Sequence, residues 1–193
     1  MDSPLANIAI DLGEVALDSS IQDGVLQDIP ILGTAINLAR AVSSVRDRLL
    51  LRKIQSFLLP CAQLTSEERA KFRKRMEDEQ NFRDKVEEIL VLYLDRCDAL
   101  RKAQIYGAIF MGLARETIDI QVFNRLIYCV DHSFTDDLDT LGQYPKVGKP
   151  GFRNARMKAI ALPDLMRQTN VIECHISPEG STLLRLMEEA KIV

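Results

Sequence analysis

The sequence predicts a mainly α-helical protein, a helical bundle with a small C-terminal α+β appendage. Apolar residues recur at helical spacing along most of residues 5–142, and helix start signals precede several of these stretches. The aromatic share is only 6% and tryptophan is absent. Aliphatic side chains must therefore build the core, which suits packed helices better than a large β-sandwich. A chain of 193 residues has room for one domain, or for one domain with an appendage.

Two apolar segments open the chain. Residues 5–17 predict a short helix, and the polar residues 18–28 a connection. Pro30 then lies in the first turn of a long predicted helix, where its missing N–H costs nothing. Helical spacing continues to Leu59, and Pro60 is expected to end the helix. At 1.5 Å per residue this helix, residues 31–59, would be about 43 Å long.

Side chains that can cap a helix N-terminus precede three further helical stretches: Thr65, Asp119 and Thr135. Thr65 and Glu68 form a capping box at the start of a highly charged helix. The stretch 82–113 is apolar on one face and predicts either one long helix or two helices with a bend near Asp98. Gly107 and Gly112 within it suit close helix packing better than phosphate binding.

The chain changes character after Gly142. Residues 143–156 hold two Pro, two Gly and four cations, without an acid. We therefore expect three parts: a helical bundle over 1–142, a basic loop or linker over 143–156, and an appendage over 157–193.

The appendage is expected to combine a short helix, a strand and a final helix. Residues 162–168 predict the short helix, and the alternating residues 171–176 predict the strand. Ser177 as N-cap, with Pro178 at the first helical position, is a clear start for the last helix.

No catalytic or metal-binding motif stands out, so we expect neither enzyme activity nor a cofactor, metal ion or small-molecule substrate. Cys129 with His132, and Cys174 with His175, supply ligand types found in zinc sites. However, neighbours on a strand point to opposite faces, so Cys174 and His175 could hardly share an ion. The acidic cluster over 131–139 is better explained by helix capping and solvation, because helix N-termini favour acids.

The amphipathic helix 31–59 is the first candidate surface. Its later part is rich in cations, and such a helix can dock in a groove of a partner protein or lie in a membrane interface. A core helix whose cations face water is the third interpretation. The residues of the candidate partner or membrane face are Ile31, Ala35, Ile36, Val42, Val45, Leu49, Arg46 and Arg52.

The loop 146–158 is the second candidate surface. Its cations could contact nucleic-acid phosphates, although the net charge of −3 gives no global bias toward nucleic acid. A solvated linker is the alternative. The possible nucleic-acid contacts are Lys146, Lys149, Arg153, Arg156 and Lys158.

The composition favours a cytoplasmic protein. The four cysteines are dispersed and form no Cys-x-x-Cys pair, which is typical of reduced thiols. The first residues lack the basic region of a signal peptide, and no uncharged apolar stretch reaches the length of a membrane span. A peripheral position at the inner membrane, through helix 31–59, is the alternative.

Two resemblances add to this interpretation. The segment LPDLMRQTNVIECHISPEGSTLLRLM, residues 162–187, resembles the closing part of winged-helix domains, although Thr169-Asn170 replace the usual glycine before the strand. Residues 23–58 and 102–141 are similar to helical bacterial proteins carried by mobile elements and prophages. This second resemblance transfers no catalytic motif. It implies a bacterial accessory protein in antiviral defence or genetic conflict.

The expected function is therefore that of a non-enzymatic accessory or regulatory subunit. It would act through another protein subunit or through self-association. Membrane action by helix 31–59, and nucleic-acid binding by the loop 146–158 with the C-terminal wing, are the two alternatives.

Overall fold

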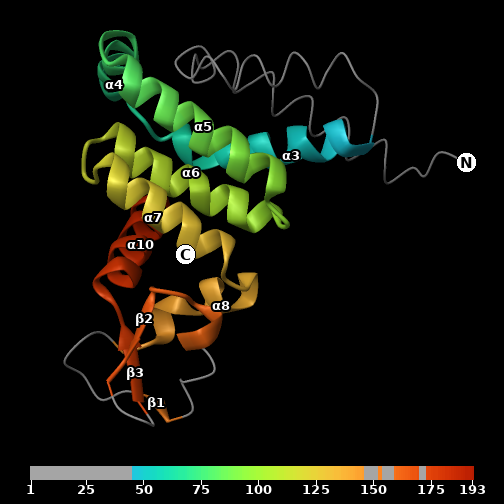
Figure 1. Ribbon diagram of the computed structural model, residues 1–193, viewed down its shortest axis with the longest axis vertical. Helices are drawn as coiled ribbons and strands as arrows, with labels where there is room; N and C mark the ends of the chain where they lie inside the picture. Colours follow the sequence, from blue (N-terminus) through green and yellow to red (C-terminus); the bar gives the residue numbers. More distant parts are fainter. Residues whose placement is uncertain (1–44, 146–151, 154–158, 170–172) are drawn as a thin grey trace, which may run out of the picture.

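The computed structural model describes residues 45–145, 152–153, 159–169 and 173–193. It confirms the predicted fold class, because helices dominate and a small antiparallel sheet lies near the C-terminus (Figure 1). The helices are α3 (Val45–Cys61), α4 (Ser66–Asp78), α5 (Gln80–Arg96), α6 (Leu100–Ala114), α7 (Ile120–Asp131), α8 (Thr135–Asp139), the 3₁₀ helix η1 (Leu141–Gln143) and α10 (Pro178–Glu189). The strands are β1 (Phe152–Arg153), β2 (Met166–Gln168) and β3 (Glu173–Ile176).

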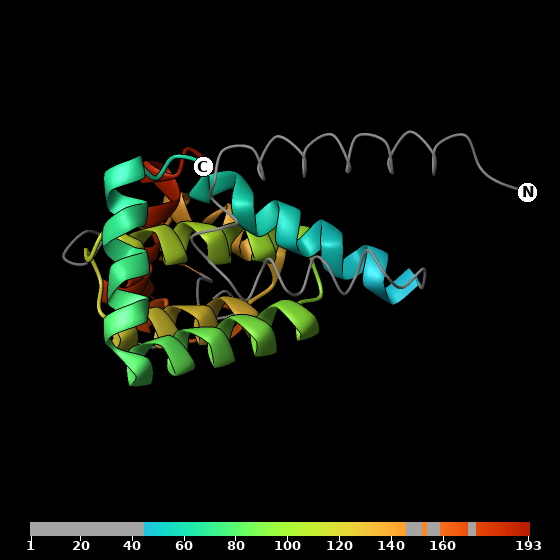
Figure 2. The ribbon, with the colours of Figure 1, turned by 90° about the horizontal axis from the view of Figure 1, so that it is seen from above.

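Helix α6 is the centre of the bundle. Twelve of its 15 residues are buried, and α3 lies along one side of it while α5 and α7 lie along the other (Figure 2). Gly107 permits the close approach of α3, because a Cβ atom there would lie 2.1 Å from the backbone oxygen of Phe57. At Gly112 a Cβ atom would lie 2.6 Å from Leu186 of α10. Both glycines therefore serve close helix packing, as predicted.

Helix α3 is buried along the side that faces α6. Ile54, Phe57 and Leu58 are at most 2% exposed, and the Phe57 ring packs against Phe110 of α6 at 5.3 Å between centroids. The helix continues to Cys61, so Pro60 lies inside its last turn and does not end it. The part of helix 31–59 before Val45 lies outside the described residues.

The predicted caps are present at three of the four helices. Thr65 and Glu68 form the capping box at 2.8 and 3.2 Å, and Asp119 caps α7 through two backbone N–H groups. Ser177 accepts a hydrogen bond from the Gly180 N–H at 2.9 Å. The assignment of Thr135 as a cap was wrong: Thr135 is the first helical residue, and no side chain caps α8.

The stretch 82–113 forms two helices, as in the second of the two alternatives. Helix α5 ends at Arg96 and α6 begins at Leu100. Cys97 leaves the helical conformation, with φ −52° and ψ 130°, and its thiol donates to the Ala99 carbonyl at 3.0 Å.

The appendage contains a three-stranded antiparallel sheet in the order β1-β3-β2. The prediction of a short helix over 162–168 was wrong, because residues 162–165 form a bend and a turn and Met166–Gln168 is strand β2. Met166 pairs with Ile176 and Gln168 with Cys174. Along β2 the buried Met166 is followed by the exposed Arg167. Pairing with β3 therefore determines the extended conformation of this segment, although the spacing of its apolar residues is helical. The predicted strand over 171–176 is confirmed where it is described, at Glu173–Ile176.

The hydrophobic core runs without interruption from the bundle into the appendage. Helix α10 packs against α6 and η1 and also contacts β3. Leu183, Leu186 and Met187 of α10 are completely buried. The last helix is therefore part of the core that α6 organises.

Candidate partner-binding surface and a buried polar network

The outward side of α3 presents apolar and cationic side chains together. Val45, Leu49 and Leu59 are 67%, 49% and 59% exposed, and Arg48 and Arg52 are exposed between them. At 3.6 residues per turn the five positions fall within roughly 100° of the helix surface. We call this set, Val45, Arg48, Leu49, Arg52 and Leu59, the α3 stripe.

The helix that carries the α3 stripe is fixed on two sides. Its inward side packs on α6, and its first turns are tied to α5 through Asp95. Arg46 donates to both carboxylate oxygens of Asp95 at 2.9 and 3.0 Å, and Lys53 donates to the Asp95 backbone carbonyl at 2.7 Å. Arg48 and Arg52, in contrast, form no ion pair with any residue in the described part of the chain.

The predicted face of helix 31–59 is only partly described. Val45, Leu49 and Arg52 lie on the α3 stripe, whereas Arg46 turns to the side and binds α5. Sequence reasoning missed Arg48 and Leu59, although both lie at the same helical spacing. The predicted face residues outside the described part are Ile31, Ala35, Ile36 and Val42.

The basic loop is also largely undescribed. For Arg153 the structure places the backbone in β1, paired with Glu173 of β3. The predicted nucleic-acid contacts that lie outside the described residues are Lys146, Lys149, Arg156 and Lys158. Nucleic-acid binding by this loop stays a prediction.

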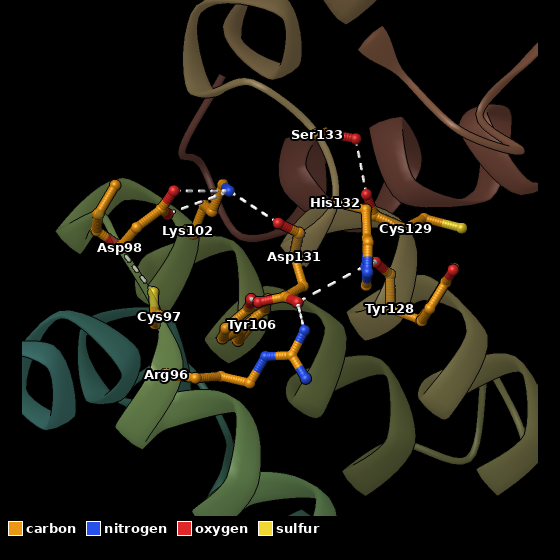
Figure 3. Close-up of polar contacts among 11 residues, drawn as sticks. Arg96, Cys97, Asp98, Lys102, Tyr106, Tyr128, Cys129, Asp131, His132 and Ser133 are labelled. Carbon is orange, nitrogen blue, oxygen red and sulfur yellow. Dashed lines mark hydrogen bonds and ion pairs between the residues drawn. The ribbon is translucent and has the colours of Figure 1, made fainter. Parts of the chain in front are cut away.

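A buried polar network joins the ends of α5 and α7 to the start of α6 (Figure 3). We call it the Asp131 network, because the Asp131 side chain, 10% exposed, is at its centre. Arg96 of α5 donates to one carboxylate oxygen, and Tyr106 of α6 donates to the other at 3.2 Å. Lys102 of α6 donates to the Asp131 backbone carbonyl at 2.8 Å.

Lys102 is the most deeply buried cation of the Asp131 network, at 3% exposure. Its ammonium group lies 3.0 Å from the carboxylate of Asp98, one turn earlier in sequence. A charge this far from water needs such partners, because the cost of its desolvation is otherwise large. The network therefore neutralises Lys102 while it connects three helices.

Burial keeps two groups near Asp131, the Tyr106 hydroxyl and the Cys97 thiol, in their protonated forms. Burial, followed by the nearby Cys97 and Asp131, raises the pKa of Tyr106 far above its ordinary value, so its hydroxyl stays a donor. Burial also raises the pKa of the Cys97 thiol, which disfavours the reactive thiolate. His132 stacks on Tyr128 at 4.1 Å between ring centroids, and its Nδ1 lies 2.9 Å from the Tyr128 carbonyl oxygen.

The acidic cluster predicted over 131–139 is divided among different partners. Asp131 binds Arg96 and Tyr106, and Asp139 accepts a hydrogen bond from Arg101 at 2.6 Å. Asp136 and Asp137 lie in the first turn of α8, as predicted from the preference of helix N-termini for acidic side chains. Among the described residues no group of three or more His, Cys, Asp or Glu side chains is placed to hold a metal ion.

The four thiols are buried and none forms a disulfide. Burial raises the pKa of Cys129 to about 11, with Asp164 as the next cause, and it raises the pKa of Cys61 still further. Cys174 is buried, and the neighbouring His175 contacts Thr169 at 3.3 Å. Cys61, Cys97 and Cys129 are therefore protonated at neutral pH, and all four thiols are buried.

An open pocket of about 400 Å³ lies between α5 and α7, the two helices seen side by side in Figure 2. Ile89, Tyr93 and Ile120 contribute apolar lining, and Lys85 and Glu88 contribute charges of both signs. Because Lys85 and Glu88 carry opposite charges, they do not favour a ligand of either sign, whereas the α3 stripe carries two cations.

No described helix has both the length and the apolar character required to cross a membrane.

Comparison with known proteins finds no significant match to a family model, to a curated protein or to a solved structure. Functional proposals for this chain therefore depend on its own residues and their geometry.

Proposed function

We propose that this protein is a non-enzymatic accessory protein that binds another protein through the α3 stripe. One observation supports this most strongly. Three large apolar side chains and two cations lie exposed along one side of a helix whose other side is anchored in the core. Amphipathic helices of this kind are a recurring recognition element in protein complexes.

The energetics of the stripe favour binding. Fully burying an exposed Leu or Val side chain yields about 1.5–3 kcal/mol. Val45, Leu49 and Leu59 are 67%, 49% and 59% exposed, so covering each of them yields about half of that value. The contacts with α5 and α6 hold the helix in place before binding, so less conformational entropy is lost on association. A small number of apolar anchors commonly carries most of an interface's binding energy.

The charges of the stripe indicate which partner surface fits. Arg48 and Arg52 would meet acidic groups favourably, and such complementarity raises the association rate and the specificity. Two copies facing each other through this stripe would bring like charges together. We therefore favour a partner with an apolar groove or helix flanked by Asp and Glu. The biological setting of this proposal, bacterial antiviral defence, comes only from the resemblance of residues 23–58 and 102–141.

Leu49→Asp is the variant that tests this function. The tagged full chain is used to capture proteins from its native host, and the same capture is repeated with Leu49→Asp. Loss of an apolar contact and a new repulsive charge should lower capture of a specific partner by about tenfold or more. Ile160→Asp is a matched control, because Ile160 is an exposed apolar residue (77%) on a different element.

Circular dichroism should show the same helix content in both variants. Equal capture by Leu49→Asp and the unmodified chain would remove the stripe as the binding surface. Equal loss in Ile160→Asp would show that the added acid, and not the stripe, controls capture.

A further inference from the structure

The acidic and basic residues of this chain are unevenly distributed. Residues 1–39 contain no Lys or Arg and six acids, which are Asp2, Asp11, Glu14, Asp18, Asp23 and Asp28. The whole chain has 28 acids and 25 cations, so 22 acids and 25 cations remain in residues 40–193, a net charge of +3. The acidic end of the chain is thus followed at once by the basic helix that carries the α3 stripe.

Residues 5–17 have the pattern of an acidic amphipathic helix. At 3.6 residues per turn the apolar side chains of one face fall within roughly 80°; they are Leu5, Ile8, Leu12 and Val15. The acids Asp11 and Glu14, with Asp18 just beyond, gather next to this face. These features complement the α3 stripe, which sets Arg48 and Arg52 beside Val45, Leu49 and Leu59.

We propose that residues 5–17 bind the α3 stripe of the same chain and are displaced when the partner protein binds. Residues 18–44 connect the two and are long enough, since an extended chain spans about 3.3 Å per residue and α3 is only about 25 Å long at 1.5 Å per residue. Closing such a loop costs little more than closing a shorter one. A tethered segment also acts at an effective concentration of about millimolar, so modest contacts suffice.

This inference rests on the proposed function for the identity of the surface, and it adds a regulator. The partner would have to compete with an internal acidic segment, so its own contact surface should share the chemistry of residues 5–17. Partner binding would be weakened by the fraction of molecules in which the stripe is already occupied. Reversing the charges of the segment should therefore increase partner capture.

The test uses Leu49→Trp in the full chain as a reporter. The chain has no tryptophan, so the indole emission of this variant comes only from the α3 stripe. Asp11→Lys with Glu14→Lys is then introduced. Emission should move to longer wavelength and quenching by acrylamide should increase, because the indole loses its cover.

The matched control is Asp23→Lys with Asp28→Lys, which changes the net charge equally outside residues 5–17. It should leave both signals unchanged. Ile160→Trp, in place of Leu49→Trp, should also show no response to either pair of substitutions. Adding Arg48→Asp and Arg52→Asp to the Asp11→Lys, Glu14→Lys variant should restore the shielding, since the ion pairs are re-formed with opposite signs.

A synthetic peptide of residues 1–20 gives a second measurement, in which the segment with its natural acids is supplied from outside the chain. Added to the chain that carries Asp11→Lys and Glu14→Lys together with the Leu49→Trp reporter, it should shield the indole, and salt should weaken the effect. Equal quenching in the parent and reversal chains, with no effect of the peptide, would overturn the proposal. Shielding lost on dilution would assign the stripe to a second copy, and shielding found only with vesicles of about one-third anionic lipid would assign it to a membrane.

The two proposals fail in distinguishable ways. If the indole of the Leu49→Trp variant is shielded as expected but no captured protein depends on Leu49, the proposed function is wrong and the internal contact remains. If Leu49→Asp abolishes capture but the indole of the reporter variant is never shielded, the stripe binds a partner and residues 5–17 do not regulate it.

Discussion

Cations occupy two contrasting settings in this molecule, the α3 stripe and the Asp131 network. In the network, Lys102 and Arg96 each meet an oxygen of Asp131, and a neutral tyrosine completes the set. On the stripe, Arg48 and Arg52 stand beside exposed apolar side chains, with no ion pair to a described residue. Charges that are already matched inside the fold serve stability, whereas exposed cations next to apolar groups remain able to bind something else. Substitutions in the Asp131 network should therefore mainly lower stability, whereas substitutions in the α3 stripe should mainly lower partner binding.

The largest effect is expected at Gly107, where α3 is anchored. In Gly107→Ala the new Cβ atom would collide with the Phe57 backbone oxygen, which lies 2.1 Å away. Displacing a helix backbone in this way should lower the free energy of unfolding by about 3 kcal/mol, measured by urea denaturation. Gly142→Ala is the control, because its Cβ atom would make an ordinary 3.4 Å contact with Leu184. Equal stability of both variants would show that α3 is not held by this contact.

Asp131→Ala should have the next largest effect. It removes the acceptor of Tyr106 and Arg96, and an unpaired hydrogen-bonding group inside a protein costs about 1–3 kcal/mol. Asp131→Asn, which keeps an acceptor for Tyr106, should be less destabilising. The comparison is made from urea midpoints of the two variants. A neutral effect of Asp131→Ala would contradict the assignment of the network to stability.

A smaller, pH-dependent effect is expected from Glu68. Burial alone would raise the pKa of Glu68, but the Thr65 N–H and the Arg115 guanidinium outweigh it and lower the pKa below its ordinary value of 4.5. Because the folded-state pKa is depressed, the stabilisation is complete above pH 4.5 and is lost as the pH falls through the folded-state value. The stability difference between the parent and Glu68→Gln should therefore shrink on acidification below about pH 4.5. A difference that stays constant between about pH 7 and pH 3 would rule this linkage out.

The smallest effect on stability is expected on the α3 stripe itself. Leu49→Ala removes an exposed side chain that is outside the core, so the free energy of unfolding should change by no more than about 0.5 kcal/mol. Thermal denaturation of the purified variant tests this. A loss as large as that of Asp131→Ala would mean that Leu49 is part of the folded core and not of a displaceable surface contact, and the contrast between the two regions would disappear.

Features set by neighbours in sequence could be predicted well. The capping box at Thr65, the Asp119 cap and the Ser177-Pro178 start depend on residues at most three positions apart. Strand β2 was missed because residues 162–168 have helical spacing, and only the pairing with β3 makes them extended. Local patterns carry no information about such a partner.

The Asp131 network was missed for a related reason. It joins residues 96, 102, 106 and 131, which no spacing rule connects. One signal was available: Lys102 is the only charged residue in the apolar stretch 102–114, and a cation on the central helix of a core requires a buried partner. The stripe was predicted in part, because Val45, Leu49 and Arg52 follow helical periodicity, but their exposure depends on which side of α3 faces α6.

The contact between Gly112 and Leu186 has a consequence for the synthesis of the protein. Helix α10, whose Leu186 lies against Gly112 of α6, is synthesised well after α6, because it follows α3 to α8 along the chain. A nascent chain that has already formed α3 to α7 would still expose the apolar surface that Leu183, Leu186 and Met187 later cover. Folding during translation should therefore reach completion only after α10 leaves the ribosome, and chains that stop before residue 178 should be prone to aggregate.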